Sequence, residues 1–423
     1  MSASAAAGVP ANTASSVARA VQRVTEGPLG AYQSAVVRIG ISATCLLFLL
    51  RELPHRHELY GPGGPWSWDM ARGLLSDNGA FTVLMWSDST VWFETVYALT
   101  LVSAALLMTG WRTRITSVLF MAGVLSLQNR SIFMGDGGDN VIHLMAIYLV
   151  LTRCARVWSL DARRAGRNAA RLAEGFGPSR DVAGPLLWGV LGAVLLPATL
   201  MGGLGGTWWL PAVLWVLWIG NGAWWALSRY APEHELRTLL DVLANLAHNF
   251  ALLVIMAEVC LIYSTAGWYK IQGSRWQDGT ATYYPLKLDY FAPWPGLSGL
   301  VASSALAIMV MTYATVIVQV AFPFTLFNRR VKNVLLVLMI AEHAGIAVLL
   351  GLPFFSMAMI AADAVFLPTV FLVWLGRTVA LGRRRLLHRP SQGRRIVPAQ
   401  RSPAVGQGEA PRGGGGDGHT LVR

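Results

Sequence analysis

The chain has 423 residues, of which 54% are hydrophobic and only 13% are charged, and its formal net charge is +12. Soluble domains carry about 25% charged residues, and repeated apolar runs of about 20 residues are typical of membrane-spanning helices. This composition excludes an ordinary soluble protein and predicts an all-α, polytopic helical membrane bundle. The alternating pattern of an outer-membrane barrel is absent from the sequence.

The N-terminal segment, residues 1–30, is rich in alanine and serine and precedes the first apolar run. We expect it to be disordered and cytoplasmic. The first apolar run begins near Ser34 and lacks a small-residue cleavage site, which predicts a first transmembrane helix rather than a signal peptide.

Residues 31–380 form the predicted transmembrane domain, for which we expect eight to ten helices. Ten apolar runs lie near 34–50, 90–110, 115–133, 140–155, 184–202, 207–227, 240–268, 298–320, 332–351 and 354–376. The fifth and sixth runs are joined by a glycine-rich turn and either span fully or re-enter. Residues 381–423 have no apolar period and predict a disordered basic cytoplasmic tail.

The arginines are clustered in alternate loops, which predicts the orientation of the chain. Six arginines fall between residues 153 and 171, and seven fall between residues 377 and 395. Cytoplasmic loops carry an excess of arginine and lysine, so we expect a multi-pass protein of the cell membrane with both termini cytoplasmic. Anionic lipid head groups are natural partners of this charge. We expect no nucleic-acid binding, because no aromatic-interleaved soluble domain accompanies the arginines.

The three cysteines predict neither a disulfide framework nor a metal site. Cys45, Cys154 and Cys260 lie in or at the ends of apolar runs and have no paired spacing. We interpret them as small buried hydrophobic residues.

Lys270 is the first candidate for a catalytic residue. It is one of only three lysines, and it ends a long apolar run among aromatic residues that include Trp268 and Trp276. Burial disfavours the charged ammonium, which is how a lysine comes to act as a general base. The alternative is a lysine that reaches the interface within an aromatic belt.

A polar, glycine-rich segment between two apolar runs is the second candidate. It contains Arg130, Asp136 and Asp139, which could contact a ligand or pair with one another. Two carboxylates without further hard ligands are weak evidence for a metal, so we predict none. The alternative is a capped turn at the start of the next helix.

Three further ionisable residues lie inside apolar runs. His143 is about one turn into the helix after Asp139 and is a second candidate for catalysis, with packing as the alternative. Glu342 and His343 lie in the middle of the ninth run, where a carboxylate must find a partner or be protonated. They either lock two helices together or contact a substrate. Because these polar groups fall on the predicted outer side, we expect Asp136, Asp139, His143, Lys270 and Trp276 to line one outward-facing cavity.

Four stretches of the sequence resemble bacterial HTTM-domain proteins (horizontally transferred transmembrane domain), a family related to the membrane domain of vitamin K-dependent γ-carboxylase. They are Arg38-Ile39-Gly40, Asn129-Arg130 with Gly138-Asp139 and then Trp158-Ser159-Leu160-Asp161, Tyr263 to Tyr284, and His343 with Gly351 to Met357. Together they cover roughly residues 35–376. Their order, rather than any single motif, carries the resemblance.

The resemblance implies a role for Lys270. In the carboxylases the lysine of an Ala-Gly-x-x-Lys segment is regarded as the base toward vitamin K hydroquinone, and this chain has Ala266-Gly267-Trp268-Tyr269-Lys270. The carboxylases continue with Leu-Asp, whereas this chain continues with Ile271-Gln272, and we expect no counterpart of their large lumenal domain. The resemblance thus implies a lipid-soluble, quinone-like ligand more than carboxylation of a protein. A non-enzymatic membrane partner of a secreted peptide system and a transporter are the alternatives.

Overall fold

The computed structural model describes residues 11–177, 179–204 and 208–387, and within these residues all regular structure is helical. The prediction of an all-α protein is thereby confirmed. The chain divides into two units, Met1–Trp374 and Leu375–Arg423. The helices and the sites described below lie in the first unit, except for the C-terminal part of the last helix.

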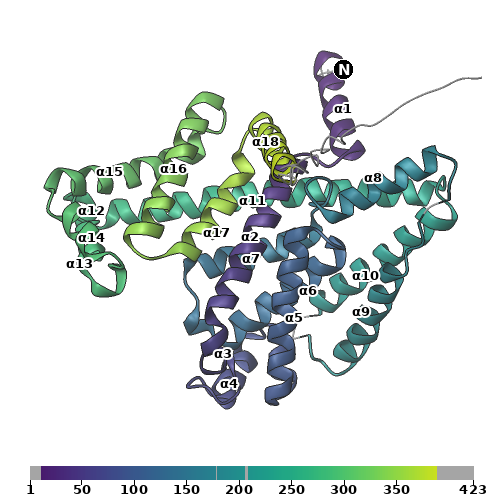
Figure 1. The fold of residues 1–423 in the computed structure, drawn as a ribbon, viewed down its shortest axis with the longest axis horizontal. Helices are drawn as coiled ribbons and strands as arrows, with labels where there is room; N and C mark the ends of the chain where they lie inside the picture. The colour runs from purple at the N-terminus through teal and green to yellow at the C-terminus, as the bar shows by residue number, and fades with distance from the viewer. Residues whose placement is uncertain (1–10, 178, 205–207, 388–423) are drawn as a thin grey trace, which may run out of the picture. The chain divides into compact units, whose positions relative to one another are not determined.

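The α-helices are labelled in Figure 1. Their bounds are α1 Ala11–Glu26, α2 Ala31–Glu52, α3 Arg56–Tyr60, α4 Trp68–Asn78, α5 Thr90–Thr109, α6 Thr113–Arg130, α7 Gly137–Leu151, α8 Leu160–Ala173, α9 Ala183–Leu200, α10 Trp209–Tyr230, α11 Glu235–Gln272, α12 Ser274–Gln277, α13 Tyr283–Lys287, α14 Pro295–Ala302, α15 Ala305–Ala321, α16 Arg329–Leu349, α17 Pro353–Asp363 and α18 Thr369–Leu387. Short 3₁₀ helices lie at Leu53–His55, Val83–Trp86, Ile132–Met134, Asp289–Phe291, Phe322–Thr325 and Ala364–Phe366.

Seven of the described helices are long and apolar enough to cross a membrane, and a bent pair raises the number to eight. The seven include α5, α9, α10, α11 and α16, together with the helical segments Ala31–Tyr60 and Ala305–Thr325. The bent pair joins Pro353–Phe366 to Thr369–Arg383 at an angle of 117°. The prediction of a multi-pass membrane protein is therefore confirmed. The seven or eight helices that could span are at or just below the predicted eight to ten.

The runs predicted at 115–133 and 140–155 correspond to α6 and α7, and neither is among the seven. Helix α7 has 15 residues, which at 1.5 Å per residue is shorter than a hydrocarbon core of about 30 Å. Helix α6 has 18 residues and carries Arg114 near its start and Gln128, Asn129 and Arg130 at its end. These polar ends make α6 too hydrophilic to count among the helices that could cross a membrane.

Residues 1–30 are expected to be disordered, and within them the structure has helix α1. Side chains of α11 hold the last turn of this helix. The side-chain amide of Asn245 donates to the Thr25 carbonyl at 2.8 Å, and that of Asn249 donates to the Val24 carbonyl at 2.9 Å. Satisfied backbone carbonyls fix a terminal segment that composition alone leaves disordered. At the other end, α18 continues to Leu387, and the rest of the predicted basic tail, 388–423, lies outside the described residues.

The core is organised around α2, which packs against α5 and α17. Arg38 of α2 is fully buried, and its guanidinium donates to the carbonyls of Leu107 at 2.6 Å and Trp158 at 2.8 Å. These bonds reach backbone carbonyls in the last turn of α5 and just before α8. Arg38 thus holds three segments together.

Helices α9 and α10 form a hairpin held by two tryptophans. The indoles of Trp188 and Trp218 stack at 4.1 Å, and each indole nitrogen donates to the other residue's carbonyl at 2.9 Å. Both helices are long enough to span, which fits the full-span alternative better than re-entry.

Helix α11, with 38 residues, links two regions of the first unit. Its N-terminal half packs against α1 and α10, whereas its C-terminal half packs against α15 and carries Lys270 (Figure 1).

Candidate functional site

A cavity of about 740 Å³ lies between the C-terminal half of α11 and helices α7, α12, α13, α15, α16 and α17. Its wall is mainly aliphatic and aromatic, with few polar side chains, among them Lys270, Gln319, Glu342 and His343. Pockets that hold drug-sized ligands span about 300–1,000 Å³ and are mostly apolar with a few convergent polar groups. This cavity has both properties.

One wall of the cavity carries a polar chain across three helices. Lys270 Nζ of α11 donates to the Gln319 amide oxygen of α15 at 2.8 Å. The Gln319 amide nitrogen donates to Glu342 Oε1 of α16 at 2.6 Å. A neutral amide therefore separates the lysine from the carboxylate, and the two form no direct ion pair within the described residues.

Two features of the sequence allow this chain of contacts. Gly267 lets α11 approach α15 closely, because a Cβ at this position would lie 2.6 Å from Val320 Cγ2. Trp276, in the short helix that follows Lys270, holds its ring 5.3 Å from the lysine nitrogen, within the range of a cation–π contact.

A second polar group forms beside the first. The Tyr263 hydroxyl of α11 lies 2.9 Å from His343 Nε2 of α16 and 2.9 Å from Asp363 Oδ2 of α17. All three side chains are at most 2% exposed. The hydroxyl donates to Asp363, so it accepts from His343, and the ring proton is then on Nε2.

Three atoms of these groups are buried without a hydrogen-bond partner. They are Glu342 Oε2, His343 Nδ1 and Asp363 Oδ1. Buried polar atoms are nearly always paired, so an unpaired one calls for an explanation such as an absent ligand. Glu342 and His343 both line the cavity, and a ligand with hydrogen-bond donors would satisfy them.

The structure brings four of the predicted residues to this cavity: Lys270, Trp276, Glu342 and His343. Asp136, Asp139 and His143 are not among its lining residues, although their neighbours Gly137 and Asn140 are. The expected convergence of all five residues on one cavity is therefore met only by Lys270 and Trp276.

Asp136 and Asp139 form a capping box at the start of α7. Asp136 Oδ1 accepts from the Gly138 and Asp139 backbone, and Asp139 Oδ2 accepts from the Asp136 backbone at 2.8 Å. Such reciprocal bonds satisfy the free N–H groups of a helix start. His143 Nδ1 contacts the Gln128 amide oxygen at 2.6 Å, which joins α7 to α6. These positions fit the capping and packing alternatives.

Arg130 and Trp268 also lie away from the cavity wall. Arg130 is buried, and its guanidinium donates to the carbonyls of Gly61 at 2.9 Å and Trp66 at 3.0 Å. It therefore anchors the loop after α3. Trp268 is 62% exposed, as expected for a side chain that faces lipid or the interface.

Sequence reasoning assigned no role to Gln319, which is the central link of the polar chain. The signal was present, because Gln319 is a polar side chain within the otherwise apolar α15. Tyr263 gave no such signal, since a tyrosine near a helix end is usual in a membrane protein.

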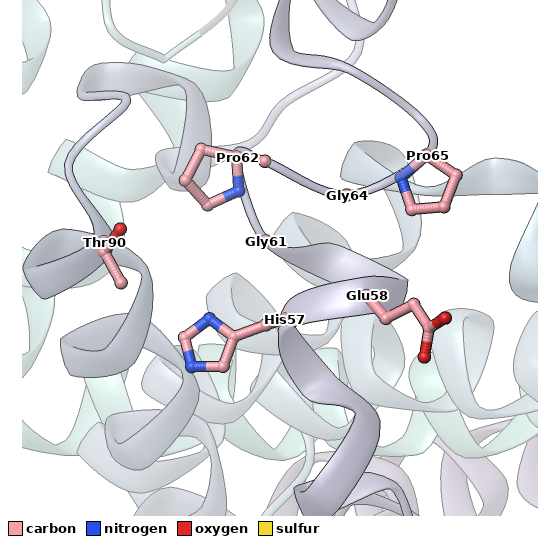
Figure 2. A pocket seen from close by; sticks show the side chains of 8 residues that line it. His57, Glu58, Gly61, Pro62, Gly64, Pro65 and Thr90 are labelled. Carbon is pink, nitrogen blue, oxygen red and sulfur yellow. The ribbon is translucent and has the colours of Figure 1, made fainter.

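A smaller pocket of about 390 Å³ lies beside the loop after α3 (Figure 2). It is lined by His57, Glu58, Thr90 and the segment 61–65, and His57 Nε2 pairs with Glu94 at 2.6 Å. Within the described residues, no three histidine, cysteine or acidic side chains cluster in a way that could hold a metal.

Comparison with family models, curated proteins and solved structures gives no match for this chain.

Proposed function

We propose that this membrane protein binds a lipid-soluble, quinone-like ligand in the cavity beside Lys270, and that Lys270 acts on it as a base. The observation that carries the proposal is the joint placement of Lys270, Gln319, Glu342 and His343 on the wall of one apolar cavity. The resemblance of the Lys270 segment to the carboxylase motif motivates the choice of a quinone.

The lining supports an apolar ligand body. Most of the wall consists of side chains such as Leu338, Ile346 and Phe355. Transfer of an apolar surface into such a wall is favourable at about 25 cal/mol per Å². A ligand that reaches the cavity through the bilayer has to share this character.

The polar wall supports a ligand with an acidic O–H group. Lys270 bonds to a neutral amide rather than a carboxylate, so it is not held in the ammonium form by a direct ion pair. An amine in an apolar cavity favours its neutral, basic form. His343 Nδ1 is left as an acceptor for a second hydroxyl of the ligand, which a hydroquinone provides.

We also propose that the cavity opens toward the extracytoplasmic side of the cell membrane. The support is the alternation of arginine-rich loops, which assigns both termini and the loop after α10 to the cytoplasm. The Lys270 end of α11 then lies on the opposite side.

Isothermal titration calorimetry with a short-chain hydroquinone tests the role of Lys270. Titrations in two buffers with different ionisation enthalpies report how many protons binding releases. A neutral lysine takes the ligand proton itself, so wild type releases almost none. Lys270→Arg cannot accept a proton, so an ionised ligand there releases about one proton to the buffer. Lys270→Met lacks the charge, and we expect it to bind more weakly without proton release.

Two results would contradict the proposal. Equal proton release by wild type and Lys270→Arg would mean that Lys270 takes no proton from the ligand, either because it is already a cation or because the ligand keeps its proton. Equal affinity and enthalpy in all three proteins would reduce Lys270 to an interfacial anchor and favour the non-enzymatic alternative.

A further inference from the structure

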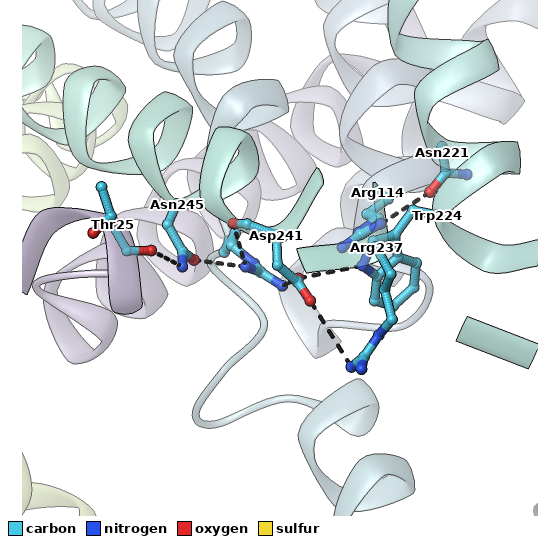
Figure 3. Close-up of polar contacts among 8 residues, drawn as sticks. Thr25, Arg114, Asn221, Trp224, Arg237, Asp241 and Asn245 are labelled. Carbon is cyan, nitrogen blue, oxygen red and sulfur yellow. Dashed lines mark hydrogen bonds and ion pairs between the residues drawn. The ribbon is translucent and has the colours of Figure 1, made fainter. Parts of the chain in front are cut away.

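A cluster of arginines lies at the other end of α11, far along the chain from Lys270. Arg114 is near the start of α6, Arg153 and Arg156 follow the end of α7, and Arg237 is in the first turn of α11. The start of α6, the end of α7 and the start of α11 thus meet beside the last turns of α10, and Figure 3 labels Arg114 and Arg237 there. Helix ends of a membrane bundle lie at the depth of lipid head groups.

The cluster is held by a single carboxylate, that of Asp241. Its Oδ1 accepts from Arg153 at 2.8 Å and from the Trp224 indole at 3.2 Å, and its Oδ2 lies 3.9 Å from Arg237. The Asn245 amide oxygen also accepts from Arg153 at 2.6 Å. Figure 3 shows these contacts around Asp241.

The remaining two arginines have no carboxylate partner among the described residues. Arg114 contacts only neutral groups: its guanidinium lies 3.9 Å from the centre of the Trp224 ring and donates to Asn221 at 3.2 Å. Arg156 is exposed, and the repulsion among Arg114, Arg153 and Arg156 is offset in part by the Asp241 carboxylate, which forms no ion pair with Arg114 or Arg156. The nearby carboxylates are already in use, since Asp161 caps α6 and Asp181 pairs with Arg112.

The surface beside the cluster is apolar. Helix α10, which carries Asn221 and Trp224, has no buried residue and exposes Val213, Val216 and Ile219. A ligand that combines an anionic head with apolar tails would contact the arginines with its head and α10 with its tails.

We infer that Arg114, held against Trp224, and Arg156, three residues after Arg153, bind the phosphate of an anionic phospholipid. Arginine matches a phosphate with paired N–H donors, and basic pockets between the ends of transmembrane helices bind such head groups. The site is separate from the proposed ligand cavity, because none of its residues lines that cavity.

Native mass spectrometry of the delipidated full-length protein tests the site. The protein is titrated with phosphatidylglycerol, phosphatidylcholine and inorganic phosphate. We expect phosphatidylglycerol to bind more tightly than phosphatidylcholine, and the double variant Arg114→Gln/Arg156→Gln to lose roughly 30-fold in affinity for it, from two basic groups near the surface. Arg114→Lys/Arg156→Lys keeps the charge and should retain much of the binding.

The matched control is Arg163→Gln/Arg167→Gln, which removes two exposed arginines of α8 outside the cluster. A similar loss in this control would overturn the site in favour of diffuse surface charge. Equal affinity for inorganic phosphate and phosphatidylglycerol would also overturn it, since the site would then recognise a free anion. Unchanged binding of phosphatidylcholine shows that each variant is folded.

Discussion

Replacement of Tyr263 by phenylalanine removes one hydroxyl from the buried polar group that Tyr263 forms with His343 and Asp363. That hydroxyl bonds to His343 and Asp363, each at 2.9 Å, and the Asp363 carboxyl has no other hydrogen bond among the described residues. Phenylalanine keeps the ring that packs against Phe322 at 6.1 Å, so apolar packing changes little. The experiment therefore isolates the polar contacts.

The expected cost follows from the two partners that lose their bond. A buried polar group without a partner costs about 1–3 kcal/mol, whereas hydrogen bonds between transmembrane helices average about 0.6 kcal/mol and reach about 1.7. The larger range applies here, because Tyr263 and Asp363 are at most 1% exposed. We expect Tyr263→Phe to lower the free energy of unfolding by about 2–4 kcal/mol.

Unfolding in mixed micelles with increasing dodecyl sulfate measures this free energy. The control is the double variant Tyr263→Phe/Asp363→Leu, which should recover the part of the loss that comes from Asp363, because the carboxyl is removed together with its partner, whereas His343 Nε2 stays unpaired in both variants. A loss below about 0.5 kcal/mol in the single variant, with no recovery in the double one, would refute the reasoning, since that is the range of ordinary surface changes.

Three further outcomes are expected. Gly138→Ala should destabilise the protein by about 1–3 kcal/mol in the same assay, because the new Cβ would lie 2.7 Å from Phe355 Cα; no loss would mean that α7 and α17 separate easily. Arg112 holds the pKa of Asp181 below its usual value by hydrogen bonding to the carboxylate. The contribution of this ion pair to the free energy of unfolding is therefore complete at neutral pH and is lost as the pH falls through the lowered pKa. Unfolding measured from pH 7 downward should therefore show a stability difference between wild type and Asp181→Asn that vanishes in acid, and a difference constant with pH would contradict it. Ser274→Cys, at the exposed first residue of α12, should react with an impermeant maleimide in intact cells above the wild-type background, and labelling only after lysis would reverse the proposed orientation.

The sequence predicts the fold class well because membrane-spanning helices need long apolar runs. Helices such as α5, α10 and α16 follow directly from such runs. The apolar pattern cannot predict the ordering of α1, which depends on two asparagines more than 200 residues away. Nor does it separate α6 and α7 from true spans, because their lengths and polar ends are decisive only once the helix bounds are known.

The candidate site is predicted only in part, for a related reason. Lys270 and Glu342 stand out because a charge in an apolar run is costly, and both line the cavity. Asp139 and His143 stand out for the same reason, but both are hydrogen-bonded locally, Asp139 in a capping box and His143 to Gln128. Whether a polar group is satisfied locally or left for a ligand depends on contacts between helices, which a single sequence does not contain.

The occupancy of the cavity by a lipid-soluble ligand tests the central claim most directly. Gly345 lines the cavity, and a Cβ there meets no atom within 4 Å, so Gly345→Leu adds volume at an open position of the cavity wall. Gly220→Leu is the control, because it is equally open and lies outside the cavity. Solvent extraction and mass spectrometry of the purified proteins should find an isoprenoid quinone or similar lipid with wild type and Gly220→Leu, but not with Gly345→Leu. The same ligand content in all three proteins, or none in wild type, would contradict the account.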